Sequence, residues 1–508
     1  MADRPHPNGA AGPAPPPFEW TAEEIRRIGR RVADLIADHL SGLPAGPVFR
    51  PVPAALADAM VATPAPERGE PADRVLDRFA AEIAPYPFGN GHPRFYGWVN
   101  PPPAPIAVFA AALAAAMNPS VAGGNHASVW LERQVVEWFK QLLGFPRDAA
   151  GLLVSGGSAA AITALAVARH AACAARGWDV RAAGVQRVEA GGRAARLLVY
   201  QSREGHSCHQ KAVELLGLGS AHLRTVPCDA ALRMVPEALD RMLREDLARG
   251  DVPVAVVASA GTVNTGAVDP LGSLAEVCAR HRVWLHVDGA YGAPAVLSGA
   301  YGEELARLAL ADSVAVDPHK WLYVPVDAGL VLVKDARAMR DAFSLVPAYL
   351  RSDDDVHGVH GPPWFSEYGA EQTRPFRALK VWAALRYFGA AGYRALVEHD
   401  LALARHLAGL VRKAPELELW EPQGLSIVCF RASPPELRGK GDAEDRLNRA
   451  VLREVQLGGK GFLSSTVLGG RFWLRACVVN PRATERDVEA VLEAVREAVQ
   501  RSQRLRDG

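Results

Sequence analysis

The sequence predicts an α/β protein: a large domain with a mostly parallel sheet, a helical lobe before it and a small α+β domain after it. Two observations carry this prediction. After about residue 130, short apolar runs rich in β-branched residues alternate with helical stretches, which is typical of a parallel sheet covered on both faces. Before this region the pattern indicates helices alone, and after it a mixture of helices and strands.

The N-terminal part is expected to be helical. Residues 1–17 are dominated by Pro, Gly and Ala and predict a disordered tail, because they cannot bury enough apolar surface to become ordered. From Thr21 to Leu40, apolar residues recur at three- and four-residue steps, and Thr21 with Glu24 makes a capping box. A second helix is expected over residues 72–83. We assign residues 18–97 to this lobe.

The large domain is placed at residues 98–376. Its strands are predicted at 152–154, 197–200, 254–257, 283–287, 314–316 and 330–333, and helices at 131–143, 158–172 and 271–281. From Arg377 a long helical stretch leads into the small domain, residues 377–508. Strands are expected there near 426–430 and 472–478, with a final helix from Thr484.

Composition favours a small-molecule enzyme. There are 57 basic and 56 acidic residues, a net charge of +1, which argues against nucleic-acid binding because that needs a clustered basic excess. The six cysteines show no CxxC pair, so neither a metal site nor a disulfide framework is expected. The chain shows no secretory signal pattern, and its most apolar stretch, 106–117, is too short to span a bilayer. We expect a cytoplasmic protein that does not bind membranes.

A lysine follows the predicted strand 314–316, in the segment Asp317-Pro318-His319-Lys320-Trp321. An arbitrary lysine at a strand end is usually just solvated. A lysine that holds an aldehyde cofactor as a Schiff base must instead sit at a fixed point with its amine partly desolvated, and His319 beside it can bond a phosphate oxygen. Lys320 is therefore the candidate for covalent attachment of pyridoxal 5′-phosphate (PLP).

Asp288 comes directly after the predicted strand 283–287, at the strand end outside which ligands bind in open α/β sheets. PLP works as an electron sink while its pyridine nitrogen is protonated, and a paired carboxylate raises the pKa of that nitrogen. Asp288 fits this role, although a helix N-cap is the commoner fate of a lone aspartate at such a turn.

Two further motifs are weak when taken singly. Residues 152–159 read as a strand, a glycine turn and an alanine-rich helix, so a phosphate would lie near Gly157 and Ser158, at free N–H groups and the positive end of the helix dipole. His206 follows the strand 197–200, where its ring can stack on the pyridine face opposite the lysine. Most single histidines are only surface or core residues.

Along the chain the motifs come in the order glycine turn, His206, segment 261–266, Asp288 and Lys320. In that order they resemble the group II PLP-dependent amino acid decarboxylases, typified by aromatic L-amino acid decarboxylase. The resemblance runs from about His92 to the C-terminus. It implies PLP fold type I, similar to aspartate aminotransferase, and a homodimer with active sites at the subunit interface. It also implies roles for Lys320 (covalent attachment), Asp288 (pyridine nitrogen), His206 (ring stacking), Gly157, Ser158 and His319 (phosphate) and Ala290 (packing under the ring).

The resemblance also bears on the reaction. Residues 347–350 resemble the start of the family's mobile catalytic loop, which implies that Tyr349 donates a proton to the substrate carbon after carbon dioxide leaves. We therefore expect decarboxylation of an L-amino acid, with aromatic substrates favoured. Trp98 and Phe95 suggest an apolar pocket with an aromatic wall. Val263 and Asp317 stand where the animal enzymes carry threonine and asparagine.

Three alternatives remain. An aminotransferase on the same fold would clamp the substrate carboxylate with arginine, for which Arg475 is the candidate. An aldehyde synthase is a second alternative, and the presence of both His206 and Tyr349 counts against it. From a different class, an inactive relative could serve as a scaffold. Retention of Lys320, Asp288 and His206 together counts against that reading.

Overall fold

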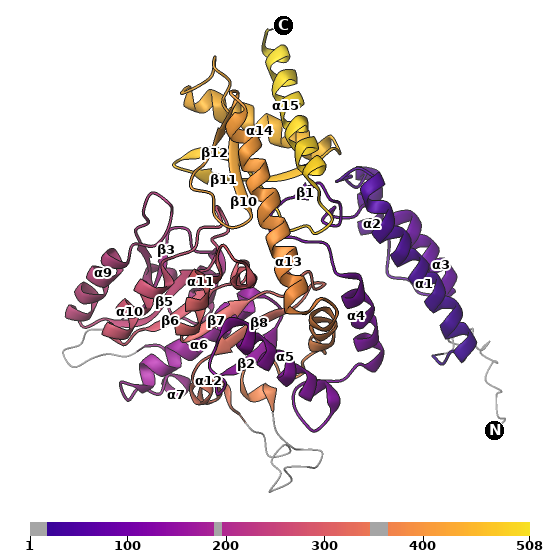
Figure 1. Cartoon of the computed structure of the whole chain (residues 1–508). Helices are drawn as coiled ribbons and strands as arrows, with labels where there is room; N and C mark the ends of the chain where they lie inside the picture. The colour runs from indigo at the N-terminus through magenta and orange to yellow at the C-terminus, as the bar shows by residue number, and fades with distance from the viewer. Residues whose placement is uncertain (1–17, 187–195, 346–363, 508) are drawn as a thin grey trace, which may run out of the picture.

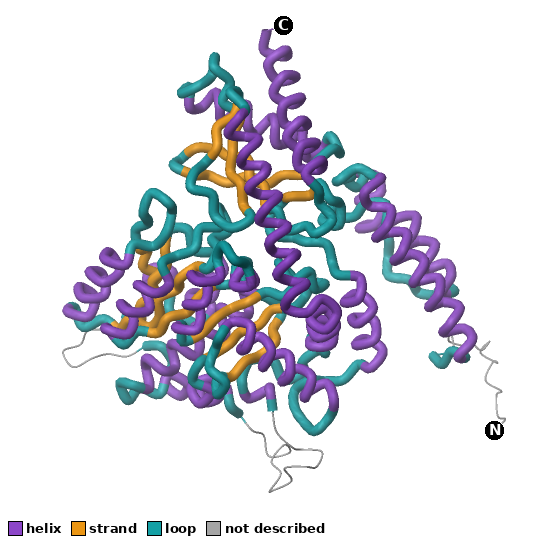
Figure 2. The backbone as a smooth tube through the Cα atoms, in the orientation of Figure 1, coloured by secondary structure: helices purple, strands orange, loops and turns teal. Residues whose placement is uncertain are grey.

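Two sheets and a long connecting helix organise the chain. The computed structural model describes residues 18–186, 196–345 and 364–507, with side chains as far as residue 502. Its strands form a seven-stranded and a five-stranded sheet (Figure 2). Helix α13 (Ala378–Lys413) contacts helices of the large domain and strands of the small one (Figure 1). It begins one residue after the predicted start of the helical stretch.

The large sheet has the order β2-β8-β7-β6-β5-β3-β4. Its strands are β2 (Ala150–Val154), β3 (Leu197–Ser202), β4 (Leu223–Val226), β5 (Val252–Ser259), β6 (Trp284–Asp288), β7 (Ser313–Val316) and β8 (Gly329–Val333). Only β8 runs antiparallel to its neighbours, so the prediction of a mostly parallel sheet is confirmed. Every predicted strand of this domain is present. β4, a largely half-exposed edge strand, was not predicted.

The helices of this domain lie around the sheet. They are α4 (Pro105–Met117), α5 (Ala127–Leu143), α6 (Gly157–Ala174), α7 (Val180–Ala183), α8 (Ser207–Leu215), α9 (Pro236–Ala248), α10 (Leu271–His281), α11 (Gly302–Leu305) and α12 (Ala336–Phe343). By length and composition alone, α6 is apolar enough to cross a membrane. It packs against α8 and against β5, β7 and β8, however, which is the position of a core helix.

The N-terminal lobe consists of α1 (Ala22–Gly42), α2 (Ala54–Ala62) and α3 (Ala72–Arg78), followed by a π-helical turn (Phe79–Ile83). The predicted capping box is present, since Glu24 N–H donates to Thr21 Oγ1 at 3.2 Å and Thr21 N–H donates to Glu24 Oε2 at 2.9 Å. No residue of the three helices is fully buried, and they project from one side of the molecule in Figure 1.

The small sheet has the order β1-β11-β12-β10-β9. Its strands are β1 (Phe95–Tyr96), β9 (Leu417–Leu419), β10 (Ile427–Ala432), β11 (Phe462–Leu468) and β12 (Arg471–Cys477), and α14 (Gly441–Leu457) and α15 (Glu485–Asp507) pack in the same domain. β1 pairs in parallel with β11, with Phe95 opposite Phe462, so the segment just before residue 98 joins the sheet of the C-terminal domain. The division at residue 97 did not anticipate this pairing.

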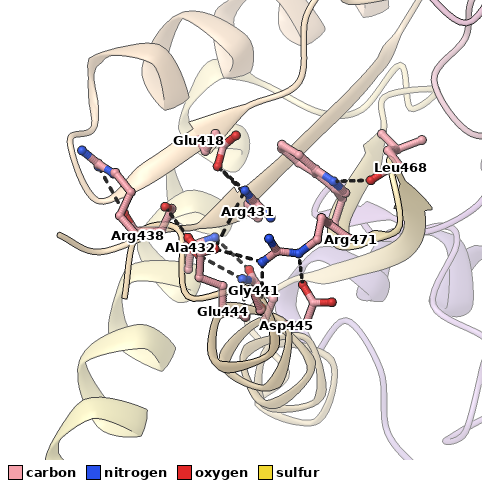
Figure 3. Close-up of polar contacts among 12 residues, drawn as sticks. Glu418, Arg431, Ala432, Arg438, Gly441, Glu444, Asp445, Leu468 and Arg471 are labelled. Carbon is pink, nitrogen blue, oxygen red and sulfur yellow. Dashed lines mark hydrogen bonds and ion pairs between the residues drawn. The ribbon is translucent and has the colours of Figure 1, made fainter. Parts of the chain in front are cut away.

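A buried polar cluster joins α14 to the small sheet (Figure 3). Glu444 on α14 is fully buried, and it accepts hydrogen bonds from Ser433 Oγ at 2.6 Å and from the Arg471 guanidinium at 2.9 Å. Arg431 on β10 pairs with Glu418 at 2.7 Å on the neighbouring strand. The cluster therefore fixes how α14 sits on β10 and β12.

Candidate active site

A cavity of about 550 Å³ lies at the carboxyl ends of the parallel strands, where the start of α6 also points. Seven of the eight residues selected from the sequence line it: Gly157, Ser158, His206, Asp288, Ala290, His319 and Lys320. The eighth, Tyr349, lies outside the described residues. Segments far apart in the chain thus meet at one point because parallel strands bring their carboxyl ends to the same edge of the sheet.

Lys320 lies four residues beyond the end of β7, and an ion pair holds its amine. Its Nζ is 2.9 Å from Asp317 Oδ2, and the Asp317 side chain is 2% exposed. Burial alone would lower the pKa of Lys320, but the carboxylates of Asp317 and Asp288 outweigh it and raise that pKa above its usual value. An amine attacks an aldehyde only as the free base, so the ion pair with Asp317 holds Lys320 in the ammonium form that must first lose a proton.

The segment that follows the lysine is anchored to α13. Trp321 Nε1 and Tyr323 Oη both donate to Asp400 Oδ2, at 2.8 and 2.6 Å, and all three side chains are fully buried. Trp321 also stacks on Tyr291, with ring centroids 5.1 Å apart. These contacts fix the backbone next to Lys320, and so fix where its amine can reach.

Asp288 is the last residue of β6 and holds a defined orientation. Its Oδ1 accepts the Ala290 N–H at 3.1 Å, and its Oδ2 lies 3.4 Å from His209 Nε2. Burial would raise the pKa of Asp288, but contact with His209 and the charge of Lys320 hold it well below its usual range. The carboxylate is therefore ionised. It caps no helix, since the helical turn that follows has Gly292 as its N-cap.

The glycine turn before α6 is tightly packed. A Cβ at Gly157 would lie 3.0 Å from Asp317 Oδ2, and a Cβ at Gly329 would lie 2.4 Å from the Gly156 Cα. The N-cap Gly156 offers no side chain, so no side-chain cap takes up the first N–H groups of α6. His319 Nδ1 is fixed 2.7 Å from the Ala328 carbonyl oxygen. The turn can therefore present free N–H donors to a phosphate.

Around His206, the structure brings in groups that the sequence analysis missed. His206 is the N-cap of α8, and its Nδ1 accepts the Cys208 N–H at 3.1 Å. Burial would raise the pKa of Cys208, but hydrogen bonds with His206 and His209 lower it to about 7. Cys208, His209 and Asp288 lie together, with polar side-chain atoms within 4.8 Å of one another. The sequence did not indicate that these three side chains meet, because Asp288 comes from β6, far along the chain from Cys208 and His209.

Arg475, the candidate carboxylate clamp of an aminotransferase, does not line the cavity. It is 3% exposed, and its guanidinium donates to the carbonyl oxygens of Val263 and Trp98 at 2.9 and 3.1 Å and to Ser464 Oγ at 3.2 Å. The Nε and Nη1 groups of Arg475 thus tie loops to the small sheet, which fits a structural role rather than a substrate clamp.

The aromatic wall is formed by Trp98 rather than by Phe95. Trp98 lines the cavity and stacks on Phe88, with ring centroids 5.5 Å apart. Phe95 is 3% exposed, packs on Phe462 and does not reach the cavity. Val263 lines the cavity as well.

These residues fit pyridoxal phosphate. A partly buried lysine amine, an ionised carboxylate at a strand end and an uncapped helix start converge on one cavity, and each matches one functional part of the cofactor. Fold and site together define a PLP-dependent enzyme of fold type I.

Comparisons with known proteins give the family. Residues 55–433 match the pyridoxal-dependent decarboxylase conserved domain. An aromatic-L-amino-acid decarboxylase from Bacillus atrophaeus is 34% identical over 481 residues, covering 94% of this chain and 96% of that protein. The crystal structure of Oryza sativa TDC with PLP and tryptamine superposes with a TM-score of 0.85 at 27% identity, covering 95% and 99% of the two chains. A phenylacetaldehyde synthase from Arabidopsis thaliana is 28% identical over 486 residues, covering 94% and 96%.

The chain therefore belongs to the pyridoxal-dependent decarboxylases, and it is a PLP-dependent amino acid decarboxylase.

Proposed function

We propose that this enzyme is a cytoplasmic homodimer that decarboxylates an aromatic L-amino acid to its amine. The observation that carries the substrate proposal is the placement of Trp98 and Val263 on the wall of the cavity that also holds Lys320 and Asp288. An aromatic ring and a branched apolar side chain give the substrate side chain an apolar surface, and no arginine stands among the residues that line the cavity in the described part of the chain.

Some of the site residues would bind the cofactor, and others would hold or transfer protons. When bound, pyridoxal phosphate supplies an electron sink for the bond that breaks at the substrate Cα. Lys320 would attach it, and the ionised Asp288 would keep a proton on its ring nitrogen. Gly157, Ser158 and His319 would hold the phosphate group.

His206 and Ala290 would cover the two faces of the ring, which excludes water from them. Tyr349, outside the described residues, would return a proton to Cα after carbon dioxide leaves, which gives the amine as product.

An amine-release screen tests this proposal. The PLP-loaded protein is incubated with each common L-amino acid, and carbon dioxide and amine are quantified together. We expect turnover with tryptophan, tyrosine or phenylalanine and little with glutamate or aspartate. Turnover only with acidic amino acids would refute the aromatic assignment, and keto acid without carbon dioxide would refute decarboxylation.

An aldehyde synthase is the second candidate, and the likeness to the phenylacetaldehyde synthase is the observation in its favour. The same screen separates the two, because an aldehyde synthase consumes oxygen and releases aldehyde, ammonia and hydrogen peroxide. We expect amine as the main product.

A further inference from the structure

A histidine stands directly behind Asp288. His209 is fully buried on α8, and its Nε2 lies 3.4 Å from Asp288 Oδ2. Its Nδ1 lies 3.2 Å from the side-chain oxygen of Gln201 on β3. Asp288 lines the cavity and His209 does not, so the carboxylate stands between the histidine and any ring bound in the cavity.

The partners of His209 determine its charge. An amide oxygen and an ionised carboxylate only accept hydrogen bonds, so the surroundings of both ring nitrogens of His209 favour the doubly protonated imidazolium. Burial would lower the pKa of His209, but its contacts with Asp288 and Cys208 raise it to about 10. The side chain is therefore an imidazolium cation throughout the neutral pH range.

The other ionisable groups described near Asp288 do not provide an equivalent positive charge beside its carboxylate. Lys320 is paired with Asp317 and is itself the group that attaches the cofactor. His286 on β6 has its ring 6.2 Å from that of His209 and its Nδ1 2.9 Å from Ser313 Oγ. Burial and the neighbouring His209 charge lower the pKa of His286 to about 3, so it is neutral. Cys208, on the same helix as His209, has a thiol whose ionised form is an anion, so it adds no cation.

We propose that His209, oriented by Gln201, is a positioning residue that keeps Asp288 ionised and thereby keeps the proton on the cofactor's ring nitrogen. The inference rests on the proposed role of Asp288. A proton shared between a carboxylate and a ring nitrogen moves to the nitrogen when a cation stabilises the carboxylate. His209 also repels the protonated ring, but more weakly, because the ring lies on the far side of Asp288 and electrostatic energy falls with distance.

The test measures directly whether the pyridine nitrogen of the cofactor is protonated. The protein is loaded with PLP carrying ¹⁵N in the pyridine ring, and the ¹⁵N chemical shift is followed against pH by NMR. In His209→Leu we expect the midpoint of ring-nitrogen protonation to fall by at least about 1 pH unit, since an opposite charge at this distance typically moves a pKa by about 1–3. His209→Gln, which keeps a donor but not the charge, should fall between parent and His209→Leu. His286→Leu is the matched control, removing a buried but neutral histidine, and should keep the parent midpoint.

Kinetics supply a second measurement. Loss of a group that orients a functional ligand costs about 10–100-fold in metal sites, and we expect a similar fall in kcat for His209→Leu with little change in KM. A merely structural role would lower the stability of His209→Leu and His286→Leu alike and leave the ¹⁵N midpoint in place.

Asp288→Asn separates this inference from the site assignment. If Asp288→Asn lowers the ¹⁵N midpoint but neither His209 variant does, the role of His209 is refuted and that of Asp288 stands. If Asp288→Asn also leaves the midpoint unchanged, the assignment of Asp288 itself is wrong. Should His209→Leu fail to fold, His209→Gln decides the question.

Discussion

Asp317 places a negative charge where the site is expected to bind a phosphate and a lysine-linked cofactor. Its carboxylate lies against the glycine turn and 2.9 Å from the Lys320 amine, and its Oδ1 is buried without a hydrogen-bond partner. A negative charge here stabilises the ammonium form of Lys320, while it disfavours a phosphate in the same turn. Both effects oppose loading of the cofactor, so we expect them to appear in the rate of loading.

Asp317→Asn should therefore load faster. Removal of the carboxylate lowers the pKa of Lys320, so a larger fraction of the amine is free base at pH 7. We expect the rate of covalent attachment after PLP is added to apoprotein, followed by visible absorbance, to rise and its pH profile to move to lower pH. Asp327→Asn, which removes a carboxylate from the ion pair with Arg377, is the control. An unchanged profile in Asp317→Asn would show that the ion pair does not control the amine.

Tyr349 carries a second prediction at the residue scale. Phenylalanine keeps the ring but removes the hydroxyl, and general acid catalysis is typically worth about 10²–10⁴-fold. We expect Tyr349→Phe to form much less amine and, under air, more aldehyde, ammonia and hydrogen peroxide. Product assays under air and under argon check this. An unchanged amine yield would place Tyr349 outside the site.

The sequence revealed site residues that stand at strand ends and helix starts, because those positions are defined by local pattern. Lys320, Asp288 and Gly157 each follow or begin a recognisable element, and all line the cavity. His209 could not be found in this way. It lies on α8, which follows β3, and it reaches Asp288 on β6 only because β5 alone separates β3 from β6 in the sheet. The role of Arg475 stayed open for the converse reason. A strand arginine has the same local pattern whether it faces a substrate or loop carbonyls.

At the scale of elements, burial decided which strands the sequence could show. β5, β7 and β8 are buried along their whole length and read as apolar runs. β11 alternates buried and exposed residues in part and contains serine and threonine, and β9 has three residues, so neither was predicted. Helix α13 began within one residue of its expected start, whereas its kink at Gly389 was not foreseen.

Helix α14 gives a prediction at this scale, because Glu444 joins it to the small sheet. Burial would raise the pKa of Glu444, but hydrogen bonds from Ser433 and Arg471 lower it below the usual 4.5. A carboxyl with a depressed pKa stabilises the fold above the unfolded-state value and loses that contribution as pH falls through the folded-state value. Glu444→Gln should cost about 1–3 kcal/mol in the free energy of unfolding at pH 7, and the difference from the parent should shrink below pH 4.5.

Urea unfolding at pH 7 and at lower pH measures this difference. Glu489→Gln, at a side chain 54% exposed in a surface pair with His406, should stay within about 0.5 kcal/mol of the parent. A cost for Glu444→Gln that does not depend on pH would mean that packing, not charge, holds α14.

The whole molecule is joined at two places that local patterns do not show. β1 inserts into the sheet of the small domain, and α13 carries Asp400 to the segment beside Lys320. Both contacts link residues far apart in the chain, so the order of elements could be predicted from the sequence while their assembly could not. The N-terminal lobe is the reverse case: α1 and α3 were predicted from local pattern and α2 was not, and none of the three helices has a fully buried residue.

That lobe leads to the prediction of a dimer. Ile25 on α1 and Val75 on α3 are 56% and 54% exposed, and an apolar cavity lies beside them between Val32, Leu76 and Phe79. Three helices that are amphipathic or apolar, with no buried residue, need a partner surface, and a second copy of the chain is the partner that the homodimer proposal supplies.

The double variant Ile25→Asp with Val75→Asp should convert the dimer to monomer. Each apolar side chain buried at an interface is worth about 1.5–3 kcal/mol, and in a two-fold dimer each substitution acts twice, so the loss should reach roughly 6 kcal/mol, or about 10⁴-fold in the dissociation constant. Sedimentation velocity over a range of protein concentrations measures the change, and decarboxylase activity should fall with the dimer fraction if the active sites are shared. Leu457→Asp, at an apolar residue 52% exposed on α14, is the matched control and should leave the dimer intact. A parent protein that is monomeric at all concentrations would refute the dimer, and a double variant that stays dimeric would show that the subunits meet through another surface.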